Sequence, residues 1–189
     1  MANRANKKGW AVWITGLPGS GKSTVANALY RHLSKLGIRV QLIPSDELRR
    51  EITPSPTYSE DDRNLLYACI AYVAKKLTEN EINVIIDATG NRRKYRDLCR
   101  KKVSHFIEVY LKCPLETCAQ REMKRKYSHR APRRIYEKGI KGESSTVPGI
   151  GVQYEEPENP EISLNSAELS ARECEEKIFE FIAKKLLKK

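Results

Sequence analysis

The chain has 189 residues, of which 31% are charged and 40% belong to the hydrophobic set, which is the composition of one globular domain rather than of a disordered or fibrous chain. No apolar run reaches the roughly 18 residues that a membrane-spanning helix needs, and residues 1–9 contain no apolar segment of a signal peptide. The five cysteines form no CxxC pair, so neither a disulfide framework nor a structural zinc site is expected. We therefore expect a cytoplasmic protein without a membrane partner, with a flexible tail over residues 1–9 and a single domain over residues 10–189.

The positive charge is concentrated in two windows of the sequence. The net charge is +11, from 35 Lys and Arg residues against 24 Asp and Glu residues. Residues 92–102 contain seven basic residues and one acidic residue, and residues 121–142 contain nine basic and two acidic residues. A generally basic surface is typical of nonspecific binding to nucleic acids, whereas two local concentrations indicate a localised anionic ligand. Solvated surface side chains are the alternative for either window alone, and a nucleic acid is not the expected partner.

Apolar patterns of strand length alternate with patterns of helical periodicity. The first predicted elements are, in chain order, a strand over 10–15, a helix over 22–36, a strand over 38–43, a short helix from Ser45 as N-cap to Glu51, and a helix from Ser59 with an apolar stripe at Leu66, Ile70, Val73 and Leu77. There follow a strand over 82–86, a helix over 92–102, a strand over 106–111, a helix from near Pro114, a strand over 161–164, and a C-terminal helix with Cys174, Ile178, Phe181 and Ile182 on one side. This alternation favours an α/β fold, with a mostly parallel five-stranded sheet and helices on both faces.

Residues 16–23 fit the GxxxxGK[ST] pattern of a phosphate-binding loop in full. They follow a predicted strand and open a predicted helix, which is the context that the motif requires, and they predict the three-layer P-loop NTPase fold. Backbone N–H groups and the helix N-terminus bind phosphate oxygens, the lysine reaches the β- and γ-phosphates, and the final serine binds Mg²⁺. A glycine-rich turn without a ligand is the weaker alternative. The predicted ATP-binding residues are Gly16, Leu17, Pro18, Gly19, Ser20, Gly21, Lys22, Ser23 and Thr24, with Lys22 also catalytic and Ser23 also a metal ligand.

Two aspartates follow predicted strands near this loop. Asp46 is expected to accept the proton of an acceptor hydroxyl or to help hold Mg²⁺, with a helix-start carboxylate as the alternative. Asp87 follows a hydrophobic strand at the Walker B position, where an aspartate holds the metal directly or through water, and an Asx-turn is the alternative. Residues 87–90 also spell the DxxG of a GTPase, but the chain contains no NKxD or TKxD for guanine.

Further motifs resemble those of the adenylylsulfate kinases (APS kinases), a family that transfers the ATP γ-phosphate to the 3′-hydroxyl of adenosine 5′-phosphosulfate (APS). The resemblance runs from about Trp10 to Asn165, and its last segment is the most specific because ordinary P-loop kinases lack it. The similar segments are residues 45–49 (DGDxxR in the family, with Asp46 and Arg49 kept), 58–63 (FSxxDR), 106–121 (its fourth strand and next helix), 141–142 with 149–150 (KGxTGI), and 154–161 (PYExPENPE).

The resemblance implies roles for the residues that match these motifs. It implies that Asp46 is the catalytic acid/base near the 3′-hydroxyl, and that Arg49 and Arg63 bind the phosphosulfate. It further implies that Arg121 lies by the ATP base and that Tyr58 stacks on the substrate adenine.

Residues 121–142 are interpreted as a basic lid, because Pro132 and the glycines at 139 and 142 accompany the nine basic residues. The resemblance implies that Lys141 reaches the reacting phosphates or the substrate from this lid. Asn91 is a further candidate substrate residue, because residues 87–91 look like those of the wider group of small P-loop kinases.

The chain departs from the family pattern at three places. The Asn and both Arg of xENxRR are replaced within residues 64–69, the Phe of KGF becomes Glu143, and ISPYR becomes residues 89–93. These departures leave ATP use untouched and concern the acceptor. A related P-loop kinase for a nucleotide sugar, a small alcohol or a tRNA-linked group is therefore the alternative, and a nucleotide-dependent binding module without transfer activity is the third possibility. The expected ligands are ATP, Mg²⁺ and APS, and the resemblance implies a homodimer.

Overall fold

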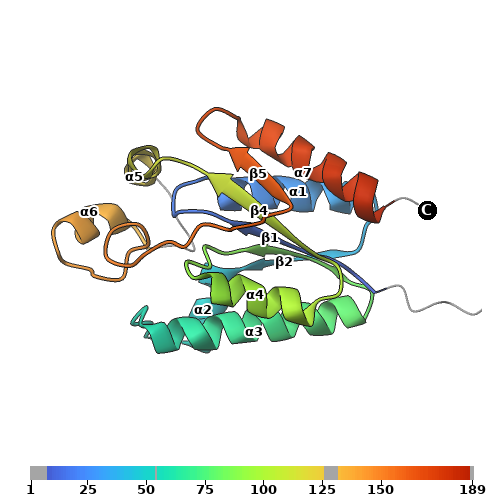
Figure 1. Ribbon diagram of the computed structural model, residues 1–189, viewed down its shortest axis with the longest axis horizontal. Helices are drawn as coiled ribbons and strands as arrows, with labels where there is room; N and C mark the ends of the chain where they lie inside the picture. The colour runs from blue at the N-terminus through green and yellow to red at the C-terminus, as the bar shows by residue number, and fades with distance from the viewer. Residues whose placement is uncertain (1–7, 54, 126–131, 188–189) are drawn as a thin grey trace, which may run out of the picture.

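The central sheet consists of five strands that all run parallel. The computed structural model describes residues 8–53, 55–125 and 132–187, and Figure 1 shows how their elements are arranged. The strands lie in the order β2-β3-β1-β4-β5, and each neighbouring pair is parallel. Their bounds are β1 Ala11–Thr15, β2 Val40–Pro44, β3 Asn83–Asp87, β4 Phe106–Lys112 and β5 Ile162–Asn165.

Helices cover both faces of this sheet. Figure 1 shows α1 and α7 on one face and α3 and α4 on the other, with α5 and α6 beyond the carboxyl ends of the strands. The predicted α/β fold with a five-stranded parallel sheet is thus confirmed. The helix bounds are α1 Lys22–Lys35, α2 Ser45–Ile52, α3 Glu60–Glu79, α4 Arg93–Lys102, α5 Leu115–Lys124, α6 Ile135–Ile140 and α7 Ala171–Leu186.

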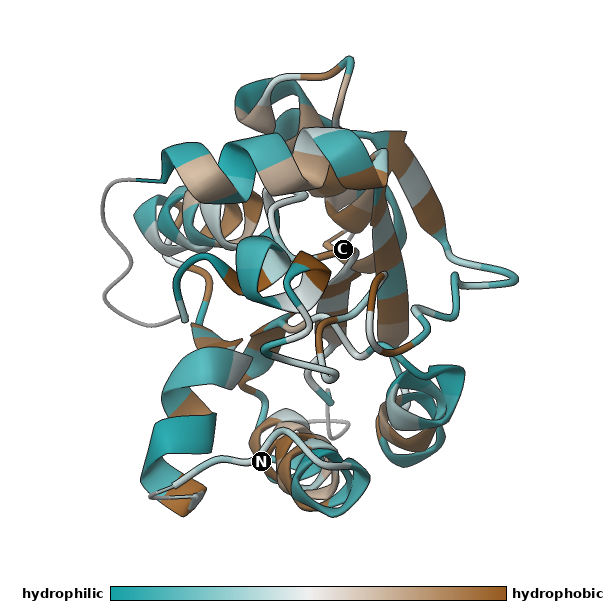
Figure 2. Cartoon of the chain, turned by 90° about the vertical axis from the view of Figure 1, so that its left-hand side faces the viewer, coloured by the Kyte–Doolittle hydropathy of each residue, from teal (hydrophilic) through white to brown (hydrophobic). Residues whose placement is uncertain are grey.

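The side chains of β1 divide between two hydrophobic cores, because successive residues of a strand point to opposite faces. Val12 and Ile14 pack in the core under α1 and α7, and Ala11 and Trp13 pack in the core under α3 and α4. Figure 2 looks at the carboxyl ends of the strands and shows hydrophobic strand segments between helices whose outer surfaces are largely hydrophilic. The two cores fix the positions of the loops that leave this end of the sheet.

Two details of the predicted helices are wrong and one is confirmed. Ser45 is not an N-cap, because Pro44 holds that position without a side-chain hydrogen bond and Ser45 is already helical. Val73 does not belong to the predicted buried stripe, because it is 36% exposed. The buried face of α3 instead includes Ala71 and Ala74, on either side of it in the sequence. Ser59 is the N-cap of α3 as predicted, and its Oγ accepts a hydrogen bond from the backbone N–H of Asp62.

The short helix α6 has no counterpart among the predicted elements. Its six residues contain both Gly139 and several polar side chains, so the segment carries no helical apolar stripe. Its buried anchor is the single side chain of Tyr136, which is fully enclosed. One aromatic residue is too little signal for periodicity to detect, and the helix therefore depends on its tertiary contacts.

The basic window over residues 92–102 is largely neutralised by the protein itself. Its side chains form ion pairs with glutamates of α3, of β4 and of the segment that precedes β5 (residues 154–161). The pairs are Arg92 with Glu60 and Glu155, Arg93 with Glu158, Lys94 with Glu60, Arg96 with Glu108, and Arg100 with Glu108 and Glu161. The interpretation of this window as a site for an anionic ligand is therefore replaced by a structural one.

Residues 1–7 of the expected flexible tail lie outside the described residues, and the division into tail and domain stays a prediction. The backbone N–H of Gly9 donates a hydrogen bond of 2.8 Å to the carbonyl of Thr78. Within the described ranges, no helix combines the length and the apolar character needed to cross a membrane.

Candidate active site

A cavity of about 910 Å³ lies where the chain leaves β1, β2 and β3. Further parts of its wall come from α5 and from residues 132–148 and 166–174. This position is where open parallel sheets bind ligands. The predicted site residues that line it are Pro18, Gly19, Ser20, Gly21, Lys22, Ser23, Thr24, Asp46, Arg49, Tyr58, Arg63, Asp87 and Arg121, whereas Gly16, Leu17, Asn91 and Lys141 lie outside the described lining.

The phosphate loop depends on glycine at positions that no other residue would suit. Gly19 has a φ of +85°, and a Cβ there would lie 2.4 Å from the carbonyl oxygen of Cys118. Gly21, with a φ of +99°, precedes the first residue of α1. Such left-handed conformations are readily adopted by glycine, and the loop leads directly into the N-terminus of α1, whose partial positive charge favours phosphate binding. The hydroxyl of Tyr136 supports the loop from α6 by donating a 2.8 Å hydrogen bond to the carbonyl of Pro18.

Lys22 lies near the two predicted carboxylates, Asp46 and Asp87. Its Nζ donates a hydrogen bond of 2.9 Å to the carbonyl of Leu17. Burial lowers the pKa of the Lys22 ammonium, and the carboxylates of Asp87 and Asp46 act in the opposite direction. Burial raises the pKa of the Asp46 carboxyl, although Lys22 and Arg49 favour its charged form. A carboxyl with a raised pKa at a cavity wall is suited to accept a proton from a hydroxyl near neutral pH.

Arg49 lines the cavity and has unused hydrogen-bond donors. Its side chain is 4% exposed, and within the described part of the chain its Nε and Nη1 have no hydrogen-bond partner. The central guanidinium carbon lies 4.6 Å from the ring centroid of Tyr58. A buried guanidinium is costly without partners, so this arrangement suits the binding of an anion at this part of the cavity wall.

Tyr58 is held in an unusual backbone conformation. Its φ is +59°, which is uncommon for a residue other than glycine. A carboxylate oxygen of Asp62 accepts hydrogen bonds from the backbone N–H groups of Thr57, at 2.6 Å, and Tyr58, at 3.0 Å. The turn thus fixes the aromatic ring at the cavity wall. Its stacking on a substrate base stays a prediction.

Arg63 uses its side-chain nitrogen atoms to join three segments of the chain. Nε donates to the carbonyl of Tyr58 at 3.0 Å, Nη1 donates to Oδ1 of Asn91 at 3.0 Å, and Nη2 donates to the carbonyl of Thr146 at 2.7 Å. Asn91 also donates from Nδ2 to the carbonyl of Gln153. The structure therefore brings Arg63 to the cavity wall and directs its donors to protein groups. The phosphosulfate-binding role of Arg63 and the substrate role of Asn91 stay predictions.

Lys141 lies at the surface and is not brought to the cavity. Its Nζ forms an ion pair of 2.8 Å with Glu137, one helical turn earlier. The basic residues of the predicted lid that do line the cavity are Arg121, Lys124, Arg125, Arg133 and Lys138. The basic window over residues 121–142 had indicated this group as a whole. The family resemblance had indicated Arg121 and Lys141. Six residues of the predicted lid, 126–131, lie outside the described residues.

At the α7 end of the cavity, Arg121 and Glu122 are neighbours with different surroundings. Nη2 of Arg121 donates to the carbonyl of Ser166 at 2.8 Å. Glu122 is 3% exposed, and its nearest described cation is Arg125, with an N–O distance of 3.8 Å. No sequence motif indicated Glu122, because a single acidic residue within a basic window gives no pattern. The ATP-base role of Arg121 stays a prediction.

The oxygen donors of Ser23 and Asp87 suit a magnesium ion. Both residues line the cavity, and a hydroxyl with a carboxylate is a hard-oxygen donor set. Among the described residues no group of three or more His, Cys, Asp and Glu side chains could hold a metal ion by itself. In kinases, Mg²⁺ binds to one or two protein ligands together with substrate phosphates.

A parallel sheet with a complete phosphate loop after β1, an aspartate at the end of β3 and a carboxyl beside the loop lysine defines a P-loop kinase. The comparisons with known proteins narrow this class. A family model described as adenylylsulphate kinase matches residues 8–165. The chain belongs to the adenylylsulphate kinase family.

Individual relatives agree with this assignment. A probable adenylyl-sulfate kinase of Archaeoglobus fulgidus is 36% identical over 157 residues, which are 83% of this chain and 96% of that protein. An adenylyl-sulfate kinase of Halothermothrix orenii is 34% identical over 180 residues, or 95% of this chain and 92% of that protein. Among solved structures, the APS kinase of Mycobacterium tuberculosis in complex with AMPPNP and APS superposes with a TM-score of 0.82 at 30% identity, covering 93% of this chain and 98% of that chain.

Proposed function

We propose that this chain transfers the γ-phosphate of ATP to the 3′-hydroxyl of APS. The observation that carries the proposal beyond the family is Arg49, which lines the cavity and has two buried donor nitrogens without a described partner. Arg49 and Asp46 are three residues apart in α2, so they lie on the same side of that helix. One helix can thus supply both an anion-binding group and a proton acceptor.

ATP is the donor in this proposal. Its phosphates would bind to the backbone of residues 16–24 and to Lys22, and the cavity wall at Arg121 would receive its base. Mg²⁺ would be held by Ser23 and Asp87, and when bound it supplies charge neutralisation for the phosphates. The basic residues of α5 and of residues 132–138 add positive charge along the same wall, which suits a reaction between two anionic substrates.

The chemical task of the protein is positioning and proton transfer. Asp46 would accept the proton of the 3′-hydroxyl as that oxygen attacks the γ-phosphorus, and the bond from phosphorus to the ADP oxygen breaks. Tyr58 would stack on the adenine of APS, with Arg49 on its phosphosulfate and Arg63 beside it. The segment over residues 121–142 would close over both substrates and exclude water, with Lys141 approaching only upon closure.

We also propose that the protein acts in the cytoplasm, and that it forms a homodimer, as the family resemblance implies. Light scattering coupled to size exclusion tests the dimer, and a mass equal to a single chain at micromolar concentration would contradict it.

A panel assay of ADP release tests the function. The purified chain is given ATP and Mg²⁺ with APS, with a sugar, with a small alcohol or with RNA as the acceptor. We expect saturable ADP release with APS alone, and formation of 3′-phosphoadenosine 5′-phosphosulfate in equal amount. Turnover of a sugar, an alcohol or RNA in place of APS would replace the proposed acceptor, and nucleotide binding without any transfer would indicate a binding module.

A further inference from the structure

The loop of residues 88–91, which directly follows Asp87, is held by hydrogen bonds from several separate elements. From β1, Nε1 of Trp13 donates to the carbonyl of Ala88 at 2.9 Å, and Oγ1 of Thr15 donates to the carbonyl of Thr89 at 2.6 Å. From α3, the hydroxyl of Tyr67 accepts from the backbone N–H of Gly90 at 3.0 Å. Side chains thus hold three successive residues of this loop, and one of these residues, Thr89, lines the cavity.

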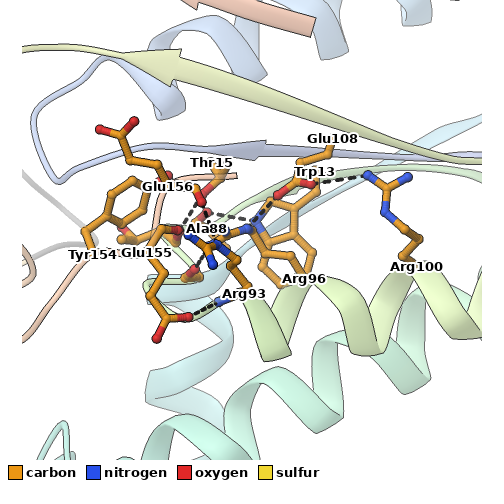
Figure 3. Close-up of polar contacts among 12 residues, drawn as sticks. Trp13, Thr15, Ala88, Arg93, Arg96, Arg100, Glu108, Tyr154, Glu155 and Glu156 are labelled. Carbon is orange, nitrogen blue, oxygen red and sulfur yellow. Dashed lines mark hydrogen bonds and ion pairs between the residues drawn. The ribbon is translucent and has the colours of Figure 1, made fainter. Parts of the chain in front are cut away.

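Arg96 of α4 completes this set of contacts from behind the cavity. Its side chain is 1% exposed, and its guanidinium reaches three different segments, as Figure 3 shows. Nε donates to Oε1 of Glu108 in β4 at 2.6 Å, Nη1 donates to the carbonyl of Gly90, and Nη2 donates to the carbonyl of Glu155 at 2.7 Å. Arg96 therefore joins β4, the loop of residues 88–91 and the segment that precedes β5.

The segment that precedes β5 is bound to the same loop by its own contacts. The backbone N–H of Glu155 donates to the carbonyl of Asn91 at 2.7 Å. The hydroxyl of Tyr154 lies 3.0 Å from Oγ1 of Thr15; since that threonine donates to Thr89, the tyrosine is the donor in this pair. The guanidinium of Arg96 lies 5.8 Å from the ring centroid of Tyr154. Tyr154 and Glu155 belong to the motif of residues 154–161, which ordinary P-loop kinases lack. In the structure these two residues do not line the cavity.

We propose that Arg96 is a positioning residue, which fixes the loop of residues 88–91 and thereby the orientation of Asp87 and Thr89 at the cavity wall. The proposal rests on the proposed function for the identity of the reaction. Arg96 does not itself line the cavity, so its effect on Asp87 and Thr89 passes through the loop of residues 88–91, which it contacts at Gly90. Gly90 packs closely against the ring of Trp13, since its φ is +50° and a Cβ there would lie 2.9 Å from that ring.

The test compares Arg96→Lys with Arg100→Lys. Lysine keeps the charge beside Glu108 and cannot reach three segments at once. Arg100 lies one turn further along α4 and also pairs with Glu108, but its other partner is Glu161 and it makes no described contact with residues 88–91. Arg100→Lys is therefore a matched control for the loss of a guanidinium from this helix.

The first readout does not need activity. The chain contains two tryptophans, so its NMR spectrum should show two indole N–H signals. The spectrum of Trp10→Phe assigns each signal to its residue. We expect Arg96→Lys to accelerate solvent exchange of the Trp13 indole proton at least about tenfold, as expected when a local contact that limits opening is lost. The Trp10 signal in the same spectrum is the internal reference, and Arg100→Lys should leave the Trp13 exchange within about twofold of the wild-type value.

The second readout separates positioning from stability. We expect kcat of Arg96→Lys to fall between about tenfold and a hundredfold, the range for a small misplacement of active-site groups, with the KM for ATP within about twofold of wild type. The gain in AMPPNP affinity on adding Mg²⁺, measured by calorimetry, should shrink in Arg96→Lys and persist in Arg100→Lys. All measurements are made at a temperature where thermal unfolding shows each variant to be folded.

The outcomes are distinct. Unchanged Trp13 exchange and unchanged kcat in Arg96→Lys would overturn the proposal, as would equal losses in both variants. If wild-type protein did not phosphorylate APS, the proposed function would fail, and the indole exchange and the Mg²⁺-dependent binding would still decide the role of Arg96. If Arg96→Lys did not fold, Thr15→Val removes the hydroxyl that holds Thr89 without changing the side-chain shape. It should then give the same three changes, and their absence would count against the proposal.

Discussion

The guanidinium of Arg49 stacks on the ring of Tyr58, with 4.6 Å between the guanidinium carbon and the ring centroid. Asp62 accepts hydrogen bonds from the backbone N–H groups of Thr57 and Tyr58, which fixes the turn that places this ring against the arginine. Its Nε and Nη1 have no described partner, so the guanidinium keeps unused hydrogen-bonding capacity at the cavity wall. A planar cation with unused donors suits a phosphate or sulfate group.

Arg49→Lys is therefore expected to raise the KM for APS between about tenfold and a hundredfold, the loss expected for a hydrogen bond to a charged group. The KM for ATP should stay within about twofold, because Arg49 lies outside the phosphate loop. Steady-state kinetics with each substrate varied in turn measures both values. Arg50→Lys is the matched control, since Arg50 is the next residue of α2, is exposed and does not line the cavity. Equal effects of both variants would contradict a specific role of Arg49.

Lys22→Ala should lower kcat at least about a hundredfold, because the γ-phosphate loses a cation where charge stabilisation dominates catalysis. The fold should persist, since Lys22 is the first residue of α1 and alanine is a good helix former. An ADP-release assay gives the rate, and the thermal unfolding midpoint of the same sample verifies the fold. Turnover at the wild-type rate in a folded variant would remove the assignment of the phosphate loop.

Asp46→Asn should keep the affinity for AMPPNP and lose at least about a hundredfold in kcat, the lower range for a positioned base. Burial raises the pKa of Asp46, and only the ionised carboxyl can accept a proton. In the wild type, kcat should therefore fall as the pH is lowered through this raised pKa, and Asp46→Asn should lack that acidic limb. A collapse of AMPPNP affinity with a normal residual rate would instead identify Asp46 as a structural or metal-supporting carboxylate.

The sequence predicted the elements that contain strong local patterns. The strands of the sheet are short apolar runs, and the phosphate loop is a dense motif, so both could be located before the tertiary structure was known. The helix α6 could not be located, because it depends on one buried tyrosine. The N-cap at Ser45 was also wrong, since Pro44 already occupies that position and no side-chain hydrogen bond is made there.

The candidate site was predictable in its residue types and less so in its contacts. A charge count cannot distinguish the arginines of α4, which pair with glutamates far away in sequence, from the basic residues of α5 and of residues 132–138, which line the cavity. The family resemblance likewise implied that Lys141 reaches the phosphates or the substrate, whereas its side chain forms an ion pair with Glu137 at the surface. The sequence did not indicate the role of Arg96, because its partners, the carboxylate of Glu108 and the carbonyls of Gly90 and Glu155, are brought together only by the fold.

Arg63→Ala is expected to change both stability and substrate binding. Removal of the guanidinium leaves Oδ1 of Asn91 and the carbonyls of Tyr58 and Thr146 without their donor, which should lower the free energy of unfolding by about 2 to 4 kcal/mol. The KM for APS should rise strongly while the KM for ATP stays nearly unchanged. Chemical denaturation and steady-state kinetics measure the two effects. A rise of the APS KM with wild-type stability would show that Arg63 acts on the substrate directly and contributes little to the fold.

The last prediction concerns the lid over residues 121–142. Its helix α6 contacts the phosphate loop through Tyr136, whose hydroxyl donates to Pro18, and Arg133 and Lys138 line the cavity. Bound phosphates should draw these cations inward, so AMPPNP together with APS should slow amide hydrogen exchange across the lid. Tyr136→Phe removes one hydrogen bond, worth about 1 kcal/mol, and should raise the KM for ATP about fivefold while leaving protection in α7 unchanged. Exchange mass spectrometry with and without both ligands makes the measurement. Equal protection of the lid in the two conditions would show that this segment takes no part in closure.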